Sequence, residues 1–228
     1  MIHDFHTHTF LSDGVLTPIE LIRRAEVAGY AVIGIADHAG AGTLERVIRE
    51  NLADARLAAQ HWRIRPLVGV ELTHVPPESI PELARQARAV GAQYVAVHGE
   101  TPVEPTCPGT NLVAVQCSDV DYLCHPGLIT LEEAKLAAAT GVFLEITARS
   151  GHSYANGHVA QVALAAGARL LMGSDAHAPG DLLSEALVEK VLRGAGLDSE
   201  HVAVVRGPNV DAFLRRSGEE SRLGLAKS

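Results

Sequence analysis

Hydrophobic and polar residues repeat one pattern along this chain. A stretch of helical period ends at a glycine, a short apolar or β-branched run follows, and His, Asp or Glu comes directly after it. The clearest copy starts at Thr17-Pro18-Ile19-Glu20, where Thr would cap the helix, Pro would fill its first turn and Glu would complete a capping box. That helix is predicted to end at Gly29, and the strand over 31–36 then leads to Asp37-His38.

Further copies of this pattern fill most of the chain. We predict additional helices over 43–60, from a cap at Ser79 to Gly91, from a cap at Thr130 to Gly141, and over 156–166. The predicted strands span 2–5, 31–36, 65–70, 94–97, 121–124, 142–146 and 169–173. Strand–helix alternation indicates a parallel sheet with helical crossovers, that is, the α/β class. Seven units without a linker favour one barrel over two open domains.

The predicted domain covers residues 1–228. Its core would span about 1–180, and a helical extension would follow over about 181–216. The polar end, 217–228, is expected to fray.

Potential metal ligands follow almost every predicted strand. In β/α barrels, the active site is built at the carboxyl ends of the strands, so residues far apart in sequence would meet there. In His6-Thr7-His8, residues two apart share a face of the strand, and Gly14 would let Asp13 turn back towards them. The nine candidate ligands are His6, His8, Asp13, His38, Glu71, His98, His125, Asp175 and His177.

The donor types indicate which ions would bind. Imidazoles mixed with carboxylates, without cysteine, suit Zn, Mn or Fe, whereas Ca or Mg would want mainly oxygen. Nine ligands exceed the needs of a single ion, so two or three divalent metal ions are expected. Glu71 ends an apolar run, where an unpaired carboxylate would be costly, and it could bridge two ions.

These residues, with the segments Ser12-Asp13-Gly14, His125-Pro126-Gly127 and Ser174-Asp175-Ala176-His177, resemble the PHP (polymerase and histidinol phosphatase) domain family over residues 1 to about 180. The resemblance implies a distorted seven-stranded (β/α)7 TIM-like barrel, a trinuclear metal site and phosphoester hydrolysis. It also implies three ligand sets, with Glu71 shared: His6, His8, Glu71 and Asp175; Asp13, His38 and His177; and Glu71, His98 and His125. Some members have His at the third ligand position, and Asp13 here resembles the branch that reads Ser-Asp-Gly.

Composition adds to this interpretation. The formal net charge of −8 and the absence of a basic run disfavour a nucleic-acid partner. Anion binding would then depend on the positive charge of the metals. Twelve histidines are many for this length. Three cysteines without a C-x-x-C pair, no signal peptide and no apolar run of membrane-spanning length predict a cytoplasmic protein without disulfides. The oligomeric state stays open.

Other residues on the same face are candidates for substrate. We assign catalysis to Asp175, His177 and Arg149, and substrate binding to Arg149 and His152. The planar guanidinium of Arg149 suits phosphate oxygens. The loop from Glu100 to Asn111, which holds three prolines, is predicted to be a semi-rigid lid.

We therefore predict a metal-dependent phosphatase that hydrolyses a small phosphorylated metabolite, a monoester, by a metal-bound hydroxide, as a histidinol phosphatase does. Three alternatives stay open: a nuclease or cyclic phosphodiesterase with the same site, an amidohydrolase-type hydrolase, and a non-catalytic PHP-like scaffold subunit. The general acid is not identified.

Overall fold

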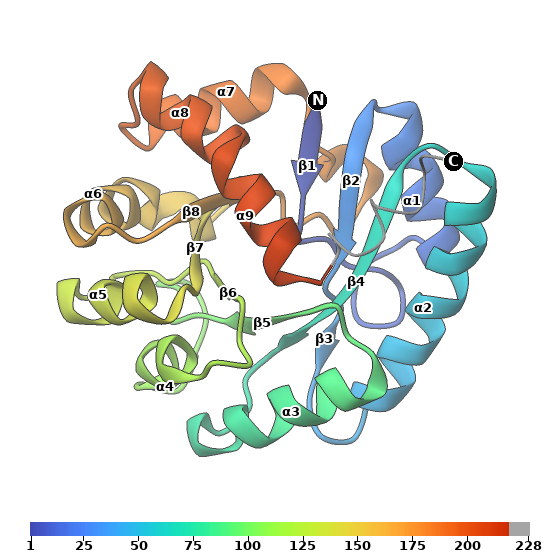
Figure 1. The fold of residues 1–228 in the computed structure, drawn as a ribbon, viewed down its shortest axis with the longest axis horizontal. Coiled ribbons are helices and arrows are strands. Elements are labelled where there is room, and N and C mark those ends of the chain that lie inside the picture. The colour runs from blue at the N-terminus through green and yellow to red at the C-terminus, as the bar shows by residue number, and fades with distance from the viewer. Residues whose placement is uncertain (219–228) are drawn as a thin grey trace.

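The computed structural model describes residues 1–218 and contains a parallel sheet curled into a nearly closed barrel (Figure 1). The strands are β1 (Ile2–Asp4), β2 (Tyr30–Ile35), β3 (His38–Ala39), β4 (Arg65–Leu72), β5 (Tyr94–His98), β6 (Tyr122–Cys124), β7 (Phe143–Thr147) and β8 (Leu170–Gly173). Seven of them form the wall in the order β1-β2-β4-β5-β6-β7-β8, and β3 pairs with β4 beyond the end of β2. The parallel bridge between Thr7 and Ala176 joins the two edges. The predicted distorted seven-stranded barrel is confirmed.

Helices pack around the barrel and across one of its ends (Figure 1). They are α1 (Pro18–Val27), α2 (Leu44–His61), α3 (Ile80–Val90), α4 (Thr110–Gln116), α5 (Leu131–Thr140), α6 (Asn156–Ala166), α7 (Glu185–Gly194), α8 (Ser199–Arg206) and α9 (Pro208–Arg216), with 3-10 turns at Pro77–Ser79, His152–Ala155 and Pro179–Asp181. The predicted helices are all present, and α4 is an addition to them. Helices α7 to α9 occupy the predicted extension, and most of the segment expected to fray, from residue 219 onward, lies outside the described residues.

The helix termini follow the local sequence in most cases. Thr130 and Glu133 form a complete capping box, and Gly91, Gly141 and Gly167 end their helices in the left-handed conformation. Two details of the prediction are wrong. Thr17 does cap α1, but the Glu20 carboxylate binds Arg24 one turn on. The Ser79 hydroxyl donates to the carbonyl of Pro76 and makes no cap bond, because a 3-10 turn precedes α3.

The apolar core has two layers that differ in composition. Between the sheet and the helices lie mostly Ala, Val, Leu and Ile. Inside the barrel, aromatic side chains gather with a few aliphatic ones. Phe213 of α9 is fully buried there, with its ring centroid 4.5 Å from that of Phe5 and 5.4 Å from that of Phe143. Tyr94 and Tyr122 complete this aromatic cluster.

Helix α9 thereby closes the amino end of the barrel, and Figure 1 shows it crossing the middle of the ring. Arg216 fixes its last turn by donating to the Asp121 carboxylate (2.7 Å) and to the carbonyls of Val120 (2.8 Å) and Thr140 (3.1 Å).

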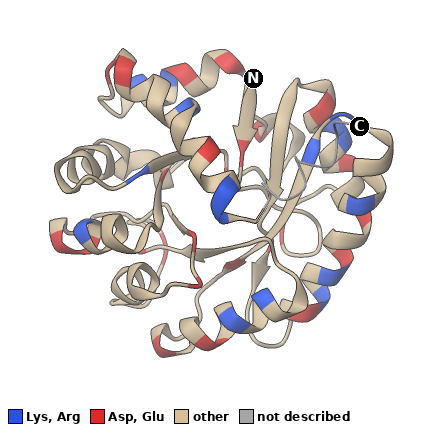
Figure 2. Cartoon of the chain, viewed as in Figure 1, with Lys and Arg blue, Asp and Glu red and all other residues tan. Residues whose placement is uncertain are grey.

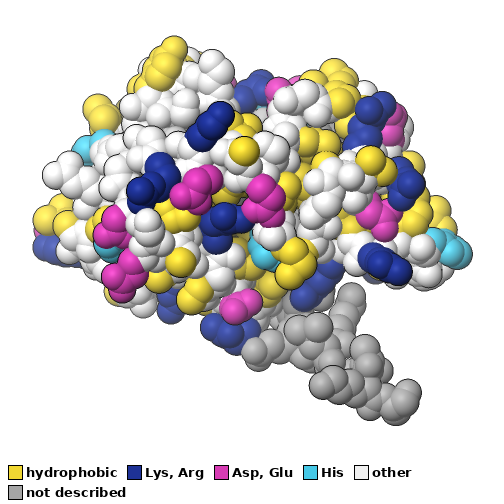
Figure 3. Space-filling model, turned by 90° about the horizontal axis from the view of Figure 1, so that it is seen from above, with side chains coloured by type: hydrophobic (Ala, Val, Ile, Leu, Met, Phe, Trp, Pro, Cys, Tyr) yellow, Lys and Arg dark blue, Asp and Glu magenta, His cyan; other side chains and the backbone are white. Residues whose placement is uncertain are grey.

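Charged side chains lie mainly on the outer helices, with both signs interspersed (Figure 2). The face in Figure 3 likewise mixes Lys and Arg with Asp and Glu, and it carries no continuous basic stripe. Within residues 1–218, no helix combines the length and the apolar character that crossing a bilayer requires.

Candidate metal centre

The carboxyl ends of the strands bring all nine predicted ligands together. His6 and His8 follow β1, His38 lies in β3, and Glu71 lies near the end of β4. His98 ends β5, His125 follows β6, and Asp175 and His177 follow β8. The ligands therefore meet because parallel strands end at one rim of the barrel.

The loop that follows β1 turns back to the rim of the barrel because its backbone makes a tight turn at Gly14. The His6 and His8 rings lie 5.0 Å apart on one face of the chain, while the Thr7 hydroxyl donates to the carbonyl of Gly34 on the neighbouring strand. At Gly14, a Cβ atom would lie 2.5 Å from the carbonyl oxygen of His8, so this position requires glycine. The tight return places Asp13 beside the histidines.

Asp37 fixes the first ligand loop through hydrogen bonds to its carboxylate, a role that the sequence interpretation missed. Its carboxylate accepts hydrogen bonds from the backbone N–H of Thr9 (2.6 Å), the hydroxyls of Thr9 (2.7 Å) and Ser12 (2.6 Å), and the amide of Asn51 (2.8 Å). The carboxylate is fully buried, so these four donors replace its hydration.

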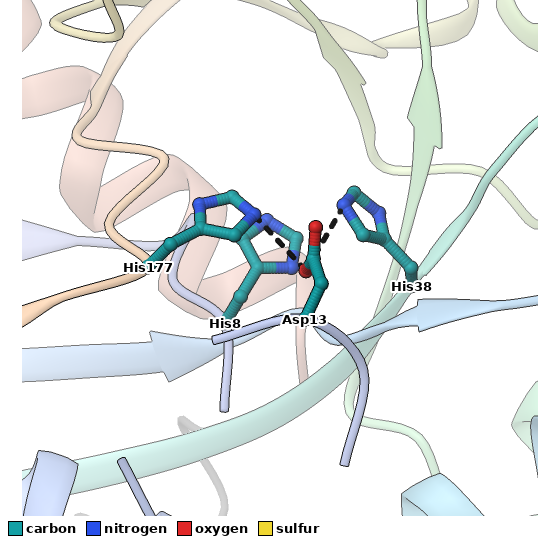
Figure 4. Close-up of side chains that lie close together, drawn as sticks. All are labelled: His8, Asp13, His38 and His177. Atoms are coloured by element: carbon teal, nitrogen blue, oxygen red, sulfur yellow. Dashed lines mark ion pairs between the residues drawn. The ribbon is translucent and has the colours of Figure 1, made fainter. Parts of the chain in front are cut away.

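One group of ligands forms at the outer side of the centre (Figure 4). Asp13 Oδ1 lies 3.1 Å from His177 Nε2 and 3.5 Å from His38 Nε2. The His8 ring is next to both histidine rings, with centroids 4.3 Å from that of His177 and 4.2 Å from that of His38. These four side chains offer ligand atoms within 4.8 Å of one another, which is a suitable spacing for one ion.

Glu71 lies at the middle of the centre and faces two sides. Its Oε2 atom is 2.6 Å from His38 Nδ1 and 3.6 Å from His6 Nε2. Its Oε1 atom is 3.3 Å from His98 Nδ1 and 3.5 Å from His125 Nε2. A carboxylate whose two oxygens face separate sets of imidazoles is placed to bridge two ions.

Asp175 completes the inner group with the first two histidines. Its Oδ1 atom lies 3.1 Å from His8 Nε2 and 3.7 Å from His6 Nε2. Its backbone has φ of +54°, and that of His125 has φ of +27°, values that non-glycine residues seldom adopt. Such local strain, on the order of 1–3 kcal/mol each, is typical of functional sites.

Glu145 of β7 supports the centre from inside the barrel wall and was also missed from the sequence. Its Oε1 atom is 2.7 Å from His6 Nδ1 and accepts the hydroxyl of Tyr122 at 3.0 Å, and its Oε2 atom accepts the N–H of His125 at 2.7 Å. At Gly173, a Cβ atom would lie 2.0 Å from Glu145 Oε1. The signal in the sequence was a carboxylate inside the apolar strand 142–146, whereas Glu71 was identified at the end of an apolar run.

Unpaired polar atoms show that this arrangement fits metal ions. Within residues 1–218, several buried ligand atoms lie near other site groups but have no hydrogen bond of acceptable geometry. Buried polar atoms are nearly always paired, so a cluster of exceptions at one rim indicates missing partners. The atoms are His6 Nε2, both ring nitrogens of His8 and of His98, His125 Nδ1, Glu71 Oε1 and Asp175 Oδ1.

In the metal-free protein, protons on histidine rings supply the positive charge that bound metal ions would otherwise provide. Burial lowers the pKa of His38, but the adjacent Glu71 and Asp13 outweigh burial and raise it to about 9. Burial raises the pKa of Glu71, yet the facing imidazoles of His38 and His6 hold it well below its usual range. Burial instead lowers the pKa of His8, to about 4, and that of His98, so these rings are neutral. His38 and Glu71 thus form an imidazolium–carboxylate pair whose proton a divalent ion could replace.

A comparison with protein families agrees with this geometry. The model of the PHP domain matches residues 4–167. This chain belongs to the PHP domain family. The match begins just before the first ligand loop and ends before β8, so Asp175 and His177 lie beyond it and are placed by the structure.

Individual proteins also resemble this PHP domain. An uncharacterized protein from Methanocaldococcus jannaschii, MJ1295, is 44% identical over 203 residues, which are 89% of this chain and 93% of that protein. A 5'-3' exoribonuclease from Haemophilus influenzae is 34% identical over 71 residues, only 31% of this chain and 23% of that protein. The crystal structure of a putative histidinol phosphatase from Listeria monocytogenes has a TM-score of 0.57 at 12% identity and covers 79% of this chain and 97% of its own.

The residues predicted to serve substrate lie around this PHP centre. His152 is buried, stacks on His125 at 4.2 Å, and has its Nε2 atom 3.9 Å from Asp175 Oδ2. Arg149 is at the rim, 35% exposed, with Nη1 3.5 Å from Asp181 Oδ2. That oxygen also accepts the N–H of His177, so Arg149 adjoins the ligands through Asp181. Their roles in catalysis and binding stay predictions.

Proposed function

We propose that this PHP domain is a metal-dependent phosphatase that hydrolyses small phosphate monoesters. The observation that carries the proposal is the two-sided arrangement of ligands around Glu71, which is suited to more than one ion. Bound ions would neutralise phosphate charge and lower the pKa of a water molecule. The ligand sets implied by the resemblance overlap with the observed groups but are not identical to them. His8 lies with Asp13, His38 and His177, and the two sides of Glu71 group it with His6 and His125 and with His38 and His98.

Two side chains of the rim would then act on the ester. The Arg149 guanidinium pairs with Asp181, whose carboxylate also accepts the N–H of His177. Because this pair lies at the partly exposed rim, the guanidinium can turn to a phosphate oxygen without disturbing the buried core. His152 has its Nδ1 atom 2.6 Å from the Thr101 hydroxyl. If that hydroxyl donates, the proton of His152 is on Nε2, which lies 3.4 Å from Glu104 Oε1 and 3.9 Å from Asp175 Oδ2. This N–H would turn from Glu104 to the ester oxygen when substrate binds.

The second candidate is a nuclease that uses the same centre. The local identity with the exoribonuclease from Haemophilus influenzae supports it. The acidic balance favours a small substrate instead.

A panel of substrates tests the proposal. The protein, loaded with Mn²⁺ or Zn²⁺, is incubated with phosphorylated metabolites, with phosphodiesters, with short 5'-phosphorylated oligonucleotides, and with amides and lactones. We expect inorganic phosphate to be released from monoesters. Cleavage of oligonucleotides alone would favour the nuclease, and turnover of amides or lactones alone would favour an amidohydrolase. No turnover by protein with measured bound metal would refute all three and favour a scaffold.

Two variants refine the assay. Arg149→Ala should raise KM for the best monoester roughly tenfold to a hundredfold, as expected for a lost charged hydrogen bond, with the bound metal unchanged. Arg85→Ala is the control, because Arg85 is exposed on α3 and pairs with Glu82 of the same helix. An Arg149→Ala protein that lost metal would contradict the assigned role.

A further inference from the structure

The loop between β5 and α4, residues 99–109, is fixed at its base. The Glu100 carboxylate accepts the backbone N–H groups of Gly109 (3.0 Å) and Asn111 (2.9 Å), and the Asn111 side chain accepts the N–H of Glu100 (3.0 Å). At Gly127, a Cβ atom would lie 2.0 Å from the Glu100 carbonyl oxygen. The turn between β6 and α5 therefore packs directly against the base of the 99–109 loop. This contact fixes where the tip of the loop lies relative to the metal centre.

The tip meets the loop that follows β7. Thr101 Oγ1 lies 2.6 Å from His152 Nδ1, and a Cβ atom at Gly151 would lie 3.4 Å from Val103. These contacts join two loops across the rim of the barrel. Glu104 follows Val103 in the sequence, and its side chain is 38% exposed.

The Glu104 carboxylate contacts three imidazoles from three elements. Its Oε2 atom is 3.0 Å from His98 Nε2 and 3.3 Å from His74 Nε2, and its Oε1 atom is 3.4 Å from His152 Nε2. The His74 backbone has φ of +51°, which costs free energy in a non-glycine residue and places its ring 4.6 Å from that of His98.

The orientation of the His98 ring explains why a carboxylate such as that of Glu104 lies beside it. Its Nδ1 atom points to Glu71, and Nε2 points away from the centre towards Glu104. His6 is oriented in a related way, with Nε2 towards Glu71 and Nδ1 hydrogen-bonded to the Glu145 carboxylate, whereas the contact of His98 Nε2 with Glu104 lacks hydrogen-bond geometry. A metal-binding histidine commonly gives its second nitrogen to a carboxylate, which fixes the ring and its tautomer. For His6 this carboxylate belongs to the barrel wall, and for His98 it belongs to a loop.

We propose that Glu104 is a positioning residue that links the β5–α4 loop to the metal centre. Through Oε2 it orients His98 for the ion shared with Glu71 and His125, and through Oε1 it holds the His152 ring at the rim until substrate binds. The second half of this proposal rests on the proposed function, and the first half rests on the centre alone.

Metal titration tests the first half without any turnover. Metal-free Glu104→Gln, which keeps the shape and removes the charge, is titrated with Mn²⁺ and followed by calorimetry and by electron paramagnetic resonance. We expect one ion to bind about 10- to 100-fold more weakly, the usual effect of losing such a partner, and the other ions to bind as in wild type. Glu132→Gln is the matched control, since Glu132 is 79% exposed on α5 and pairs with Lys135.

A double-mutant cycle locates the effect. In a His98→Ala background, Glu104→Gln should change the affinity for Mn²⁺ no further, because the partner is already gone. Unchanged affinities in the single variant, equal weakening of all ions, or a full additional loss in the His98→Ala background would each overturn the proposal. So would normal metal binding with a lowered KM, because Glu104 would then compete with the substrate. An inactive wild type that shows the expected titration would refute the proposed function and leave this inference standing.

Discussion

Replacing Glu145 by Gln tests whether the barrel wall supports the metal centre. The wild-type carboxylate serves three partners at once: Oε1 adjoins His6 Nδ1 (2.7 Å) and the Tyr122 hydroxyl (3.0 Å), and Oε2 accepts the N–H of His125 (2.7 Å). Burial raises the pKa of Glu145, but His6 and His125 outweigh burial and hold it below its usual value. The group is therefore a charged acceptor at neutral pH.

The magnitude follows from the number of acceptors. Glutamine has one oxygen, so its NH2 group must face either the His125 N–H or the side of His6. A buried donor then faces another donor, and a charge-assisted hydrogen bond worth about 1.5–3 kcal/mol is lost. Looser control of the His6 ring should also weaken metal binding about 10- to 100-fold, which corresponds to about 1.4–2.8 kcal/mol.

Two measurements separate these effects. Urea unfolding in the presence of a chelator gives the free energy of unfolding of the metal-free protein, and Mn²⁺ titration gives the metal affinity; Glu132→Gln serves again as control. We expect both quantities to fall in Glu145→Gln and neither to fall in the control. If the variant unfolds at the wild-type urea midpoint and binds every ion with wild-type affinity, Glu145 does not support the centre and our reasoning is refuted.

Three further predictions concern the same molecule. Glu71→Gln should lower the affinity for two ions at once, by at least about tenfold each, as counted by elemental analysis of the gel-filtered protein; loss of one ion alone would exclude the bridge. His38 has a pKa of about 9 in the metal-free protein and must lose its proton to bind a metal. The affinity for Mn²⁺ should therefore rise by up to about tenfold per pH unit from pH 7 towards pH 9. Equal dissociation constants at pH 7 and pH 9 would contradict this prediction. Phe213→Ala should lower the free energy of unfolding by about 3–5 kcal/mol in urea with chelator, whereas a change below roughly 1 kcal/mol would show that α9 does not pack there in solution.

The strands and the ligand positions were predictable because both follow from local sequence. A run such as Leu67-Val68-Gly69-Val70 indicates a buried strand, and the carboxylate of Glu71 directly after it required partners. The same reasoning applies to Glu145, which was overlooked because it lies inside a strand rather than at its end. Helix α4 was missed because it is short and Gly109 before it gives no side-chain cap.

Other features depend on contacts that no local pattern encodes. The role of Glu104 depends on the path of a loop with three prolines, and the role of Asp37 depends on donors from the first ligand loop and from α2. A helical segment up to residue 216 was predicted. The burial of Phe213 against Phe5 was not, because this contact joins residues 208 positions apart in the sequence. Aromatic residues are few, and their gathering inside the barrel became visible only in three dimensions.

The position of Phe213 also constrains the order in which the molecule can be completed. A ribosome makes this residue after every strand of the barrel, so the aromatic interior has no cover from α9 while the strands emerge. The metal centre has the same dependence on late synthesis, because Asp175 and His177 must reach His8, which precedes them by more than 160 residues. Contacts of such long sequence separation form slowly. The aromatic interior and the ligand set therefore stay incomplete together until the residues after β8 and those of α9 have reached Phe5 and His8.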